Sequence, residues 1–277
     1  MKSMFFDEVL AHMNENEKRA RNPLYSLPIT GAKKFLLDNI HPSLPQELRY
    51  YELPSLAPPY PEMWFEWRDS DQDDMAVYAR TQRTADGWEY GLFCFSKIKK
   101  ILAFHPVYVT FRVPSSGKLK MGEELDMSYY AGLHLEGIPS EEAENLVVDL
   151  NNNHIGMMLF AISLMHCKNI VAIEKGGQNP NIRNRRHRSK GTKHYVLDVI
   201  PARNIKRVEY EHPAGGIQQR LHFRRGHFKE YAAERPLFGK YVGTFWWEAH
   251  VAGKAELGKV VKDYQIFPKT AMCLPGE

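Results

Sequence analysis

The residues best suited to chemistry lie near the C-terminus, in the segment Leu221–Tyr231. It reads LHFRRGHFKEY, so Arg224, Arg225 and His227 flank Gly226, where the chain can turn without steric cost. Histidine can exchange protons near neutral pH, and guanidinium groups bind phosphate and stabilise developing negative charge. These residue types predict a site for a ligand that contains phosphate.

A second group follows in the sequence FWWEAHVAG, which supplies Trp246, Trp247 and His250. Cations interleaved with aromatic rings are typical of proteins that contact phosphates and stack bases. Metal-independent phosphodiester cleavage is an alternative, with His227 and His250 exchanging protons while Arg224 supports the phosphate. A third interpretation is a purely structural hairpin. The sequence leaves open whether three aromatic residues stack on a ligand or pack in the core: Trp246, Trp247 and Phe228.

Charge is strongly segregated along the 277 residues of the chain. Residues 175–235 hold 15 Lys and Arg against 5 Asp and Glu, a net charge of +10, whereas the rest carries 22 basic and 28 acidic residues. So dense a cationic segment favours a polyanionic partner such as a phosphate backbone. Within it, the run RNRRHRSKGTK predicts a basic loop whose candidate contacts are Arg183, Arg185, Arg186, Arg188, Lys190 and Lys193. A solvated loop that aids solubility, or an acidic protein partner, would also fit this composition.

One nucleotide-binding pattern is present but incomplete. Gly253–Val260 has the GxxxxGK spacing of a phosphate-binding loop, yet Val260 replaces the hydroxyl residue that would hold magnesium. Strand-forming residues follow where that loop requires a helix. We therefore expect a hairpin bounded by glycines at this position.

Metal-binding patterns are incomplete as well. The acidic run Asp69–Asp73 begins like a calcium loop but lacks the turn glycine and the bidentate glutamate, so a hairpin turn is expected. His222 and His227 are poorly spaced to share a metal ion, and no Cys-His cluster accompanies them. The sequence predicts no metal and no cofactor. Three widely separated cysteines without CxxC spacing indicate a reducing compartment, and we expect a cytoplasmic protein without membrane spans.

The elements that would position these residues follow from local patterns. The first half predicts a helix over Phe5–Arg21, a second helix over Ala32–Asn39, a proline-rich connector, and an antiparallel meander over Met63–Val113. In the second half, Ser140 suits the cap of a long helix that reaches Cys167, and Ile155 to Cys167 is its most apolar part.

The remainder of the second half predicts strands. They are expected at IVAIEK, HYVLDVI, RLHFRR, YVGTFWW and KVVKDYQIF. The predicted class is α+β, with antiparallel sheets around a long central helix. A boundary near residue 138 would divide the chain into two sub-domains, residues 1–138 with the meander and residues 139–277 with the basic β module.

Three stretches of the chain resemble functionally unassigned proteins encoded by bacteriophages and prophages. They are the aromatic strand Met63–Arg68, the helix, strand and basic loop over Ser140–Lys193, and the module at Arg225–His227 with its paired tryptophans and histidine. In that group an arginine often precedes the glycine after the histidine, whereas Ala252 stands there in this chain. The resemblance implies a phage context and no particular activity.

Together these observations predict a phage-type accessory protein that binds nucleic acid through the basic loop and the Arg-Arg-Gly-His turn. A metal-independent nuclease or toxin-like enzyme, and an inhibitor that binds a host or phage protein, are the alternatives. The oligomeric state and the choice between RNA and DNA are left open.

Overall fold

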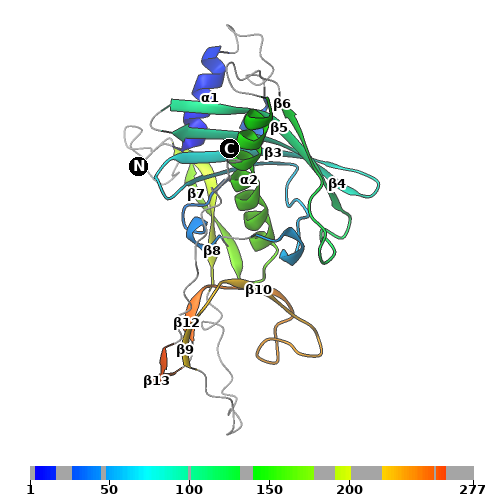
Figure 1. The fold of residues 1–277 in the computed structure, drawn as a ribbon, viewed down its shortest axis with the longest axis vertical. Helices are drawn as coiled ribbons and strands as arrows, with labels where there is room; N and C mark the ends of the chain where they lie inside the picture. The colour runs from blue at the N-terminus through cyan, green and yellow to red at the C-terminus, as the bar shows by residue number, and fades with distance from the viewer. Residues whose placement is uncertain are drawn as a thin grey trace, which may run out of the picture.

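The chain is built around one large β-sheet. The structure, a computed structural model, describes residues 4–16, 27–44, 48–98, 101–131, 140–177, 191–200, 220–252 and 254–259. Eight strands lie in the order β6-β5-β4-β3-β2-β1-β8-β7 (Figure 1). Their bounds are β1 Lys33–Leu36, β2 Glu62–Arg68, β3 Asp74–Arg83, β4 Gly87–Ile98, β5 Ile101–Pro114, β6 Met127–Ala131, β7 Ile170–Gly177 and β8 Gly191–Val199. Two α-helices accompany them among the described residues, α1 (Phe5–Asn16) and α2 (Ser140–Met165).

The antiparallel meander predicted over residues 63–113 is confirmed. β2, β3, β4 and β5 pair antiparallel in chain order, and β6 extends the series. Asp69 holds the turn between β2 and β3, because its Oδ1 accepts hydrogen bonds from the N–H groups of Asp71 and Asp73, each at 2.9 Å. The acidic run is thus a hairpin turn, as expected, in which a carboxylate replaces a backbone acceptor.

The helix predicted over Ala32–Asn39 is wrong. Residues Lys33–Leu36 form β1, which pairs in parallel with both β2 and β8, so that Phe35 lies opposite Phe65 on one side and Tyr195 on the other. These two neighbouring strands form hydrogen bonds with the backbone of β1, and Phe35 is completely buried. A helix of only two turns is marginally stable by itself. The sheet is therefore mixed rather than antiparallel, a correction within the α+β class.

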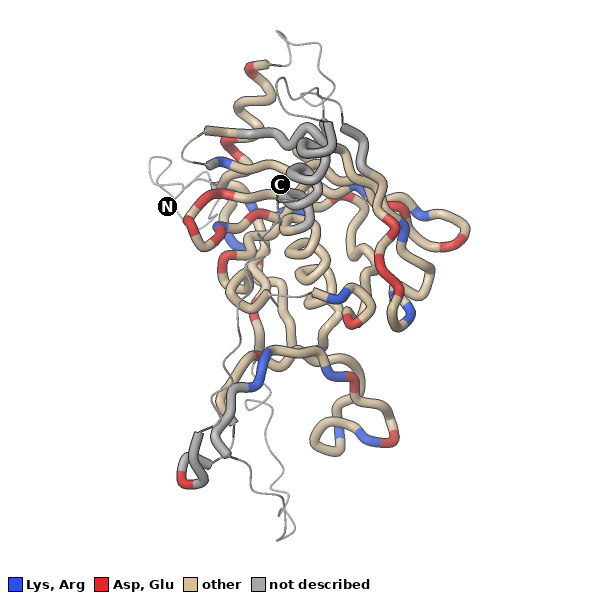
Figure 2. Tube along the Cα trace, in the orientation of Figure 1, with Lys and Arg blue, Asp and Glu red and all other residues tan. Residues whose placement is uncertain are grey.

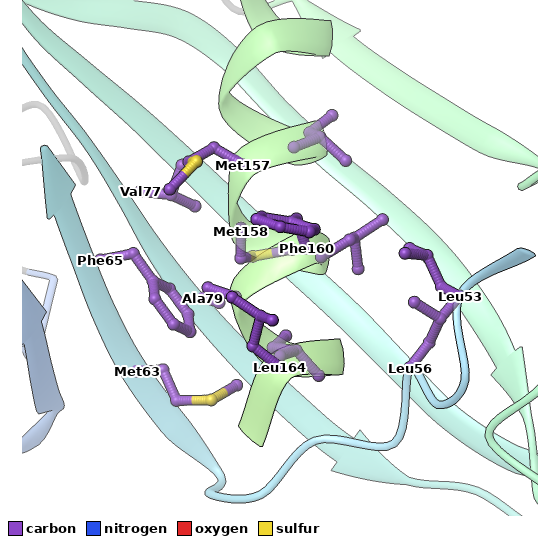
Figure 3. Packing of buried hydrophobic residues seen from close by; sticks show 14 of the residues in the cluster. Leu53, Leu56, Met63, Phe65, Val77, Ala79, Met157, Met158, Phe160 and Leu164 are labelled. Atoms are coloured by element: carbon purple, nitrogen blue, oxygen red, sulfur yellow. The ribbon is translucent and has the colours of Figure 1, made fainter. Parts of the chain in front are cut away.

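α2 packs against one face of the sheet. Its fully buried side chains include Met157, Met158, Phe160, Ile162 and Leu164. Figure 3 shows several of them against residues of the sheet and of the connector before β2. The second half of α2, residues 154–164, is buried on all sides, because the connector and the C-terminal strands cover the surface that faces away from the sheet. Because α2 lies on one face of a single sheet, the expectation of a long central helix between sheets is not supported.

α1 covers the opposite face of the sheet. Phe5, Phe6, Val9 and Met13 are buried against a cluster that includes Trp64 of β2. The helix begins at Phe5 as predicted and extends to Asn16, and residues 17–26 lie outside the described part of the chain.

A buried carboxylate fixes the start of α1. Glu66 accepts hydrogen bonds from the N–H of Phe5 (3.1 Å) and of Phe6 (2.9 Å) and from Nε1–H of Trp64 (2.9 Å). Burial raises the pKa of Glu66 to about 7, although these three donors act in the opposite direction. The carboxylate lies where a helix concentrates positive potential, so it ties the first turn of α1 to β2.

Both predicted halves of the chain contribute to the large sheet. Residues 1–138 supply β1 to β6, and residues 139–277 supply β7 and β8. The other described strands form a β module with bounds β9 Arg220–Arg224, β10 His227–Tyr231, β11 Gly243–Trp247, β12 His250–Ala252 and β13 Lys254–Lys259. Within the GxxxxGK spacing, Lys254–Lys259 form the single strand β13, so this stretch is not a phosphate-binding loop. The hairpin expected here is also wrong, because β13 pairs in parallel with β9. The strand predicted at KVVKDYQIF lies, apart from Lys259, outside the described residues.

None of the helices among the described residues combines the length and the apolar character that a membrane span requires.

Candidate nucleic-acid interface

The β10–β11 hairpin carries the candidate site and is fixed to α2 by aromatic packing. Phe228 and Trp246 are register partners, with ring centroids 4.7 Å apart. Both contact Phe160 of α2, at 5.9 Å and 5.2 Å. Trp246 is only 2% exposed, so of the two roles left open for this tryptophan the structure places it in the core. Phe228 is half-buried and packs against the same cluster.

A buried asparagine side chain fastens the same hairpin. Asn169, in the short connection after α2, donates from Nδ2 to the carbonyl of Trp246 (2.8 Å) and accepts from the N–H of Trp246 at Oδ1 (2.9 Å). Its own backbone carbonyl accepts from the N–H of Ile200 at 2.8 Å. The side-chain amide thus makes the pair of hydrogen bonds that the backbone of a neighbouring strand would make. Asn169 thereby joins β11 to the end of β8.

Gly226 is required by close packing. A Cβ atom at this position would lie 2.6 Å from Cζ2 and 2.8 Å from Cη2 of Trp246. Its φ is not in the left-handed range, which revises the expectation that the glycine serves mainly to let the chain turn. The glycine allows the indole to lie directly beneath the Arg-Arg-Gly-His turn.

Replacing Gly226 with alanine is therefore expected to destabilise the protein by about 1–3 kcal/mol, the usual effect of overpacking a rigid site. Urea unfolding measures the change. Gly122→Ala is not a suitable control, because its φ of 84° is itself strained for alanine, but Gly156→Ala has 3.7 Å of clearance and should cost less. Equal stability of Gly226→Ala and wild type would show that Trp246 can move aside.

The turn before β10 presents its polar side chains on the surface. Arg224, Arg225, His227 and Lys229 are all exposed, and Figure 2 shows basic positions where the chain enters β10. Arg224 of β9 and His250 of β12 are register partners, so their side chains leave the same face of that strand pair. The structure thus places His250 beside Arg224 of the turn.

Both candidate histidines are held by backbone carbonyls. Nδ1 of His227 lies 3.2 Å from the carbonyl oxygen of Arg225, and Nδ1 of His250 lies 2.9 Å from that of Glu248. A carbonyl only accepts, so Nδ1–H donates in each case, and a neutral ring then has its lone pair on Nε2. The two imidazoles belong to different sheets, and no hydrogen bond joins them.

Trp247 is half-buried on the opposite side of the hairpin from Trp246. Its register partner is His227, and its Nε1–H is buried without an acceptor. The ring borders the candidate site. A ring that stacks on bases needs an open face, whereas Trp247 is half-buried. In the described part of the chain, no group of three His, Cys, Asp or Glu side chains could hold a metal ion.

The described residues that bound the basic loop, Gly177 and Gly191, lie at the opposite end of β8 from the Arg-Arg-Gly-His turn. Arg183, Arg185, Arg186, Arg188 and Lys190 lie outside the described residues. Lys193 is described and pairs with Glu174 at 2.8 Å. Lys193 lies near the start of β8, which begins at Gly191. The far end of β8 is joined to β11 through Asn169 and Ile200. At about 3.3 Å per residue the two ends of β8 are roughly 25 Å apart, so the strand does not bring the base of the loop to the turn.

The family of the chain cannot be assigned by comparison. No family model, curated protein or solved structure matches it. The resemblance to phage-encoded proteins therefore stays a prediction, and function has to be inferred from geometry and charge.

Proposed function

We propose that the protein binds nucleic acid through the basic surface of its C-terminal half. Arg224, Arg225, His227 and Lys229 contact phosphates. The residues before β8 provide further cations: Arg183, Arg185, Arg186, Arg188 and Lys190. The proposal includes an accessory role in a phage, the context that the sequence resemblance implies. Trp246 is not part of the interface, because it is buried.

The observation that carries the proposal is a set of exposed cations at the start of a hairpin, and just before it, where the inner side of the hairpin is tightly packed. Phe160, Trp246 and the Asn169 amide fix the backbone from below, while the cations of the turn face solvent. Arginines on a rigid element suit phosphate recognition, since little ordering is needed on binding. The net charge of +10 over residues 175–235 supports the same ligand class.

Removing the two arginines of the turn is expected to weaken binding and to flatten its salt dependence. For Arg224→Gln/Arg225→Gln we expect an affinity about 10- to 50-fold lower near 0.1 M salt, with the slope of log K against log salt reduced by about 1.5 to 2. The Ala variant of Arg183, Arg185, Arg186 and Arg188 removes four charges, so affinity and slope should change in the same direction and by more. Fluorescence anisotropy with labelled single-stranded and duplex 20-mers from 50 to 300 mM salt measures both quantities.

Two exposed cations of the first half provide a matched control. Arg49→Gln/Lys120→Gln removes the same charge from side chains that are 56% and 88% exposed, and binding should change less than about 3-fold. An equal loss of affinity in the control would show that binding depends on the net charge of the protein and not on the turn. Affinity that does not depend on salt would instead favour an inhibitor that binds a protein.

Metal-independent cleavage is the second candidate, favoured by one observation. The Nδ1–H contacts direct Nε2 of two exposed imidazoles away from the backbone, which is the arrangement that a proton-transferring histidine needs. The same oligonucleotides incubated with chelator decide the point. Cleavage that His227→Gln or His250→Gln abolishes would establish the enzyme, whereas intact strands would leave binding as the function.

A further inference from the structure

A row of aromatic side chains crosses the large sheet on the α1 face. Trp64, Tyr78, Phe93 and Tyr108 are successive register partners on β2, β3, β4 and β5. Directly opposed residues share one face of a sheet, and Trp64 and Tyr78 belong to the cluster that α1 covers. The rings of Tyr78 and Phe93 are 6.3 Å apart, and those of Phe93 and Tyr108 are 4.8 Å apart.

This aromatic row runs from beneath α1 to the surface. Trp64 and Tyr78 are completely buried, Phe93 is half-buried, and Tyr108 is 36% exposed. α1 therefore covers one end of the row and leaves the other end open.

Gly91 determines how Tyr108 lies on the sheet. A Cβ atom at Gly91 would be 2.1 Å from Oη and 2.8 Å from Cζ of Tyr108. The phenol ring consequently rests on the backbone of β4, in the space that a side chain would otherwise fill. One side of the ring covers the glycine, and the remaining exposed surface of the ring is directed outward.

Polar groups lie beside the exposed end of the row. Arg80, Gly91, Thr110 and Ser128 are register partners on β3, β4, β5 and β6. The Arg80 side chain is 56% exposed and lies 3.7 Å from Glu62, an exposed ion pair of the weak kind that a phosphate can replace.

A buried hydroxyl lies next to Arg80. Tyr78 Oη is buried, and its polar neighbours on this face are Glu62 and Arg80. Burial raises the pKa of Tyr78 to about 12, with the Glu62 carboxylate adding to the effect. The phenol is therefore neutral at physiological pH.

We infer that this open face binds the unpaired bases of single-stranded nucleic acid, with Tyr108 and Phe93 stacking on bases and Arg80 contacting phosphate. Flat aromatic rings on an open sheet face, flanked by cations and hydroxyl groups, are suited to single strands. Bases within a duplex are already stacked on one another and cannot use such rings. The inference rests on the proposed function and deepens it, because it names the form of nucleic acid that the protein prefers.

Replacing Tyr108 with leucine tests this directly. Leucine still covers Gly91 but offers no π-face, so affinity for a labelled single-stranded 15-mer of deoxythymidine or uridine should fall about 5- to 100-fold. Affinity for a duplex 15-mer should stay within about 2-fold of wild type. Tyr108→Phe, which keeps the ring, should bind the single strand as wild type does. Tyr60→Leu is the matched control, since Tyr60 is 38% exposed and packs with Phe35 of the other face.

The outcomes separate this inference from the proposed function. A wild-type protein that binds no nucleic acid at low salt would overturn both. A second outcome is that Tyr108→Leu binds the single strand as wild type does, with an unchanged melting temperature. That result would overturn base stacking on Tyr108 and leave the proposed basic interface intact. If Tyr108→Leu fails to fold, photo-crosslinking of the wild type to a 5-iodouridine 15-mer decides. Crosslinks in the peptide that contains Tyr108 support the inference, and crosslinks confined to Arg224–Tyr231 overturn it.

Discussion

Glu66→Ala is expected to destabilise the fold by about 3–5 kcal/mol when measured at pH 5. The substitution removes the acceptor for the N–H groups of Phe5 and Phe6 and for the indole of Trp64. A buried donor that loses its acceptor costs about 1–3 kcal/mol. Urea unfolding gives the size of the loss, and protection of the Phe6 amide from hydrogen exchange reports whether α1 has separated from the sheet.

The pH dependence of this effect follows from the pKa of Glu66, which burial raises from 4.5 to about 7. Between these values the folded state binds more protons than the unfolded state, so stability falls as pH rises. The advantage of wild type over Glu66→Ala should shrink by about 2–3 kcal/mol between pH 5 and pH 8. Glu66→Gln cannot ionise and should lack this component. Identical pH profiles for wild type and Glu66→Gln would show that Glu66 does not titrate in this window.

Asn169→Ala should cost about 2–5 kcal/mol, because both backbone groups of Trp246 lose their partner in a buried place. The hairpin should loosen as well, since the amide is its polar link to the end of β8. Denaturant unfolding gives the stability, and exchange of the Trp246 amide reports local opening.

Asn39→Ala is the matched control for this substitution. Asn39 is exposed and its side-chain amide donates to the backbone carbonyl of Leu197, so its loss should cost about 0.5–1.5 kcal/mol. Equal effects of the two substitutions would mean that water replaces the Asn169 contacts. If Asn169→Ala also lowers nucleic-acid affinity while most molecules remain folded, the rigidity of the hairpin contributes to binding.

Local sequence patterns were sufficient to predict the secondary structure of long, regular elements. The meander of β2 to β5 follows from alternating aromatic and β-branched residues, and the start of α1 follows from helical spacing. Asp69 was expected in a hairpin turn because the acidic run lies between predicted strands and lacks the glycine and glutamate of a calcium loop. In each case the deciding contacts are close in sequence.

The short segment 32–39 shows where such patterns fail. Eight residues with apolar positions fit a helix or a strand equally well. Parallel pairing to β2 and β8 decided for a strand, and β8 begins more than 150 residues further along the chain. No local signal carries that information.

The candidate site divides in the same way. The sequence by itself determined the residue types, the charge segregation and the exposed Arg-Arg-Gly-His turn. Only the tertiary structure decided that Trp246 packs on Phe160, that Asn169 clamps the hairpin and that β8 separates the loop base from the turn. It also revealed the row that ends at Tyr108, because register across four strands is invisible along the chain. The physical reason is that periodicity and charge are properties of neighbouring residues, whereas burial and register depend on contacts between segments that are distant in sequence.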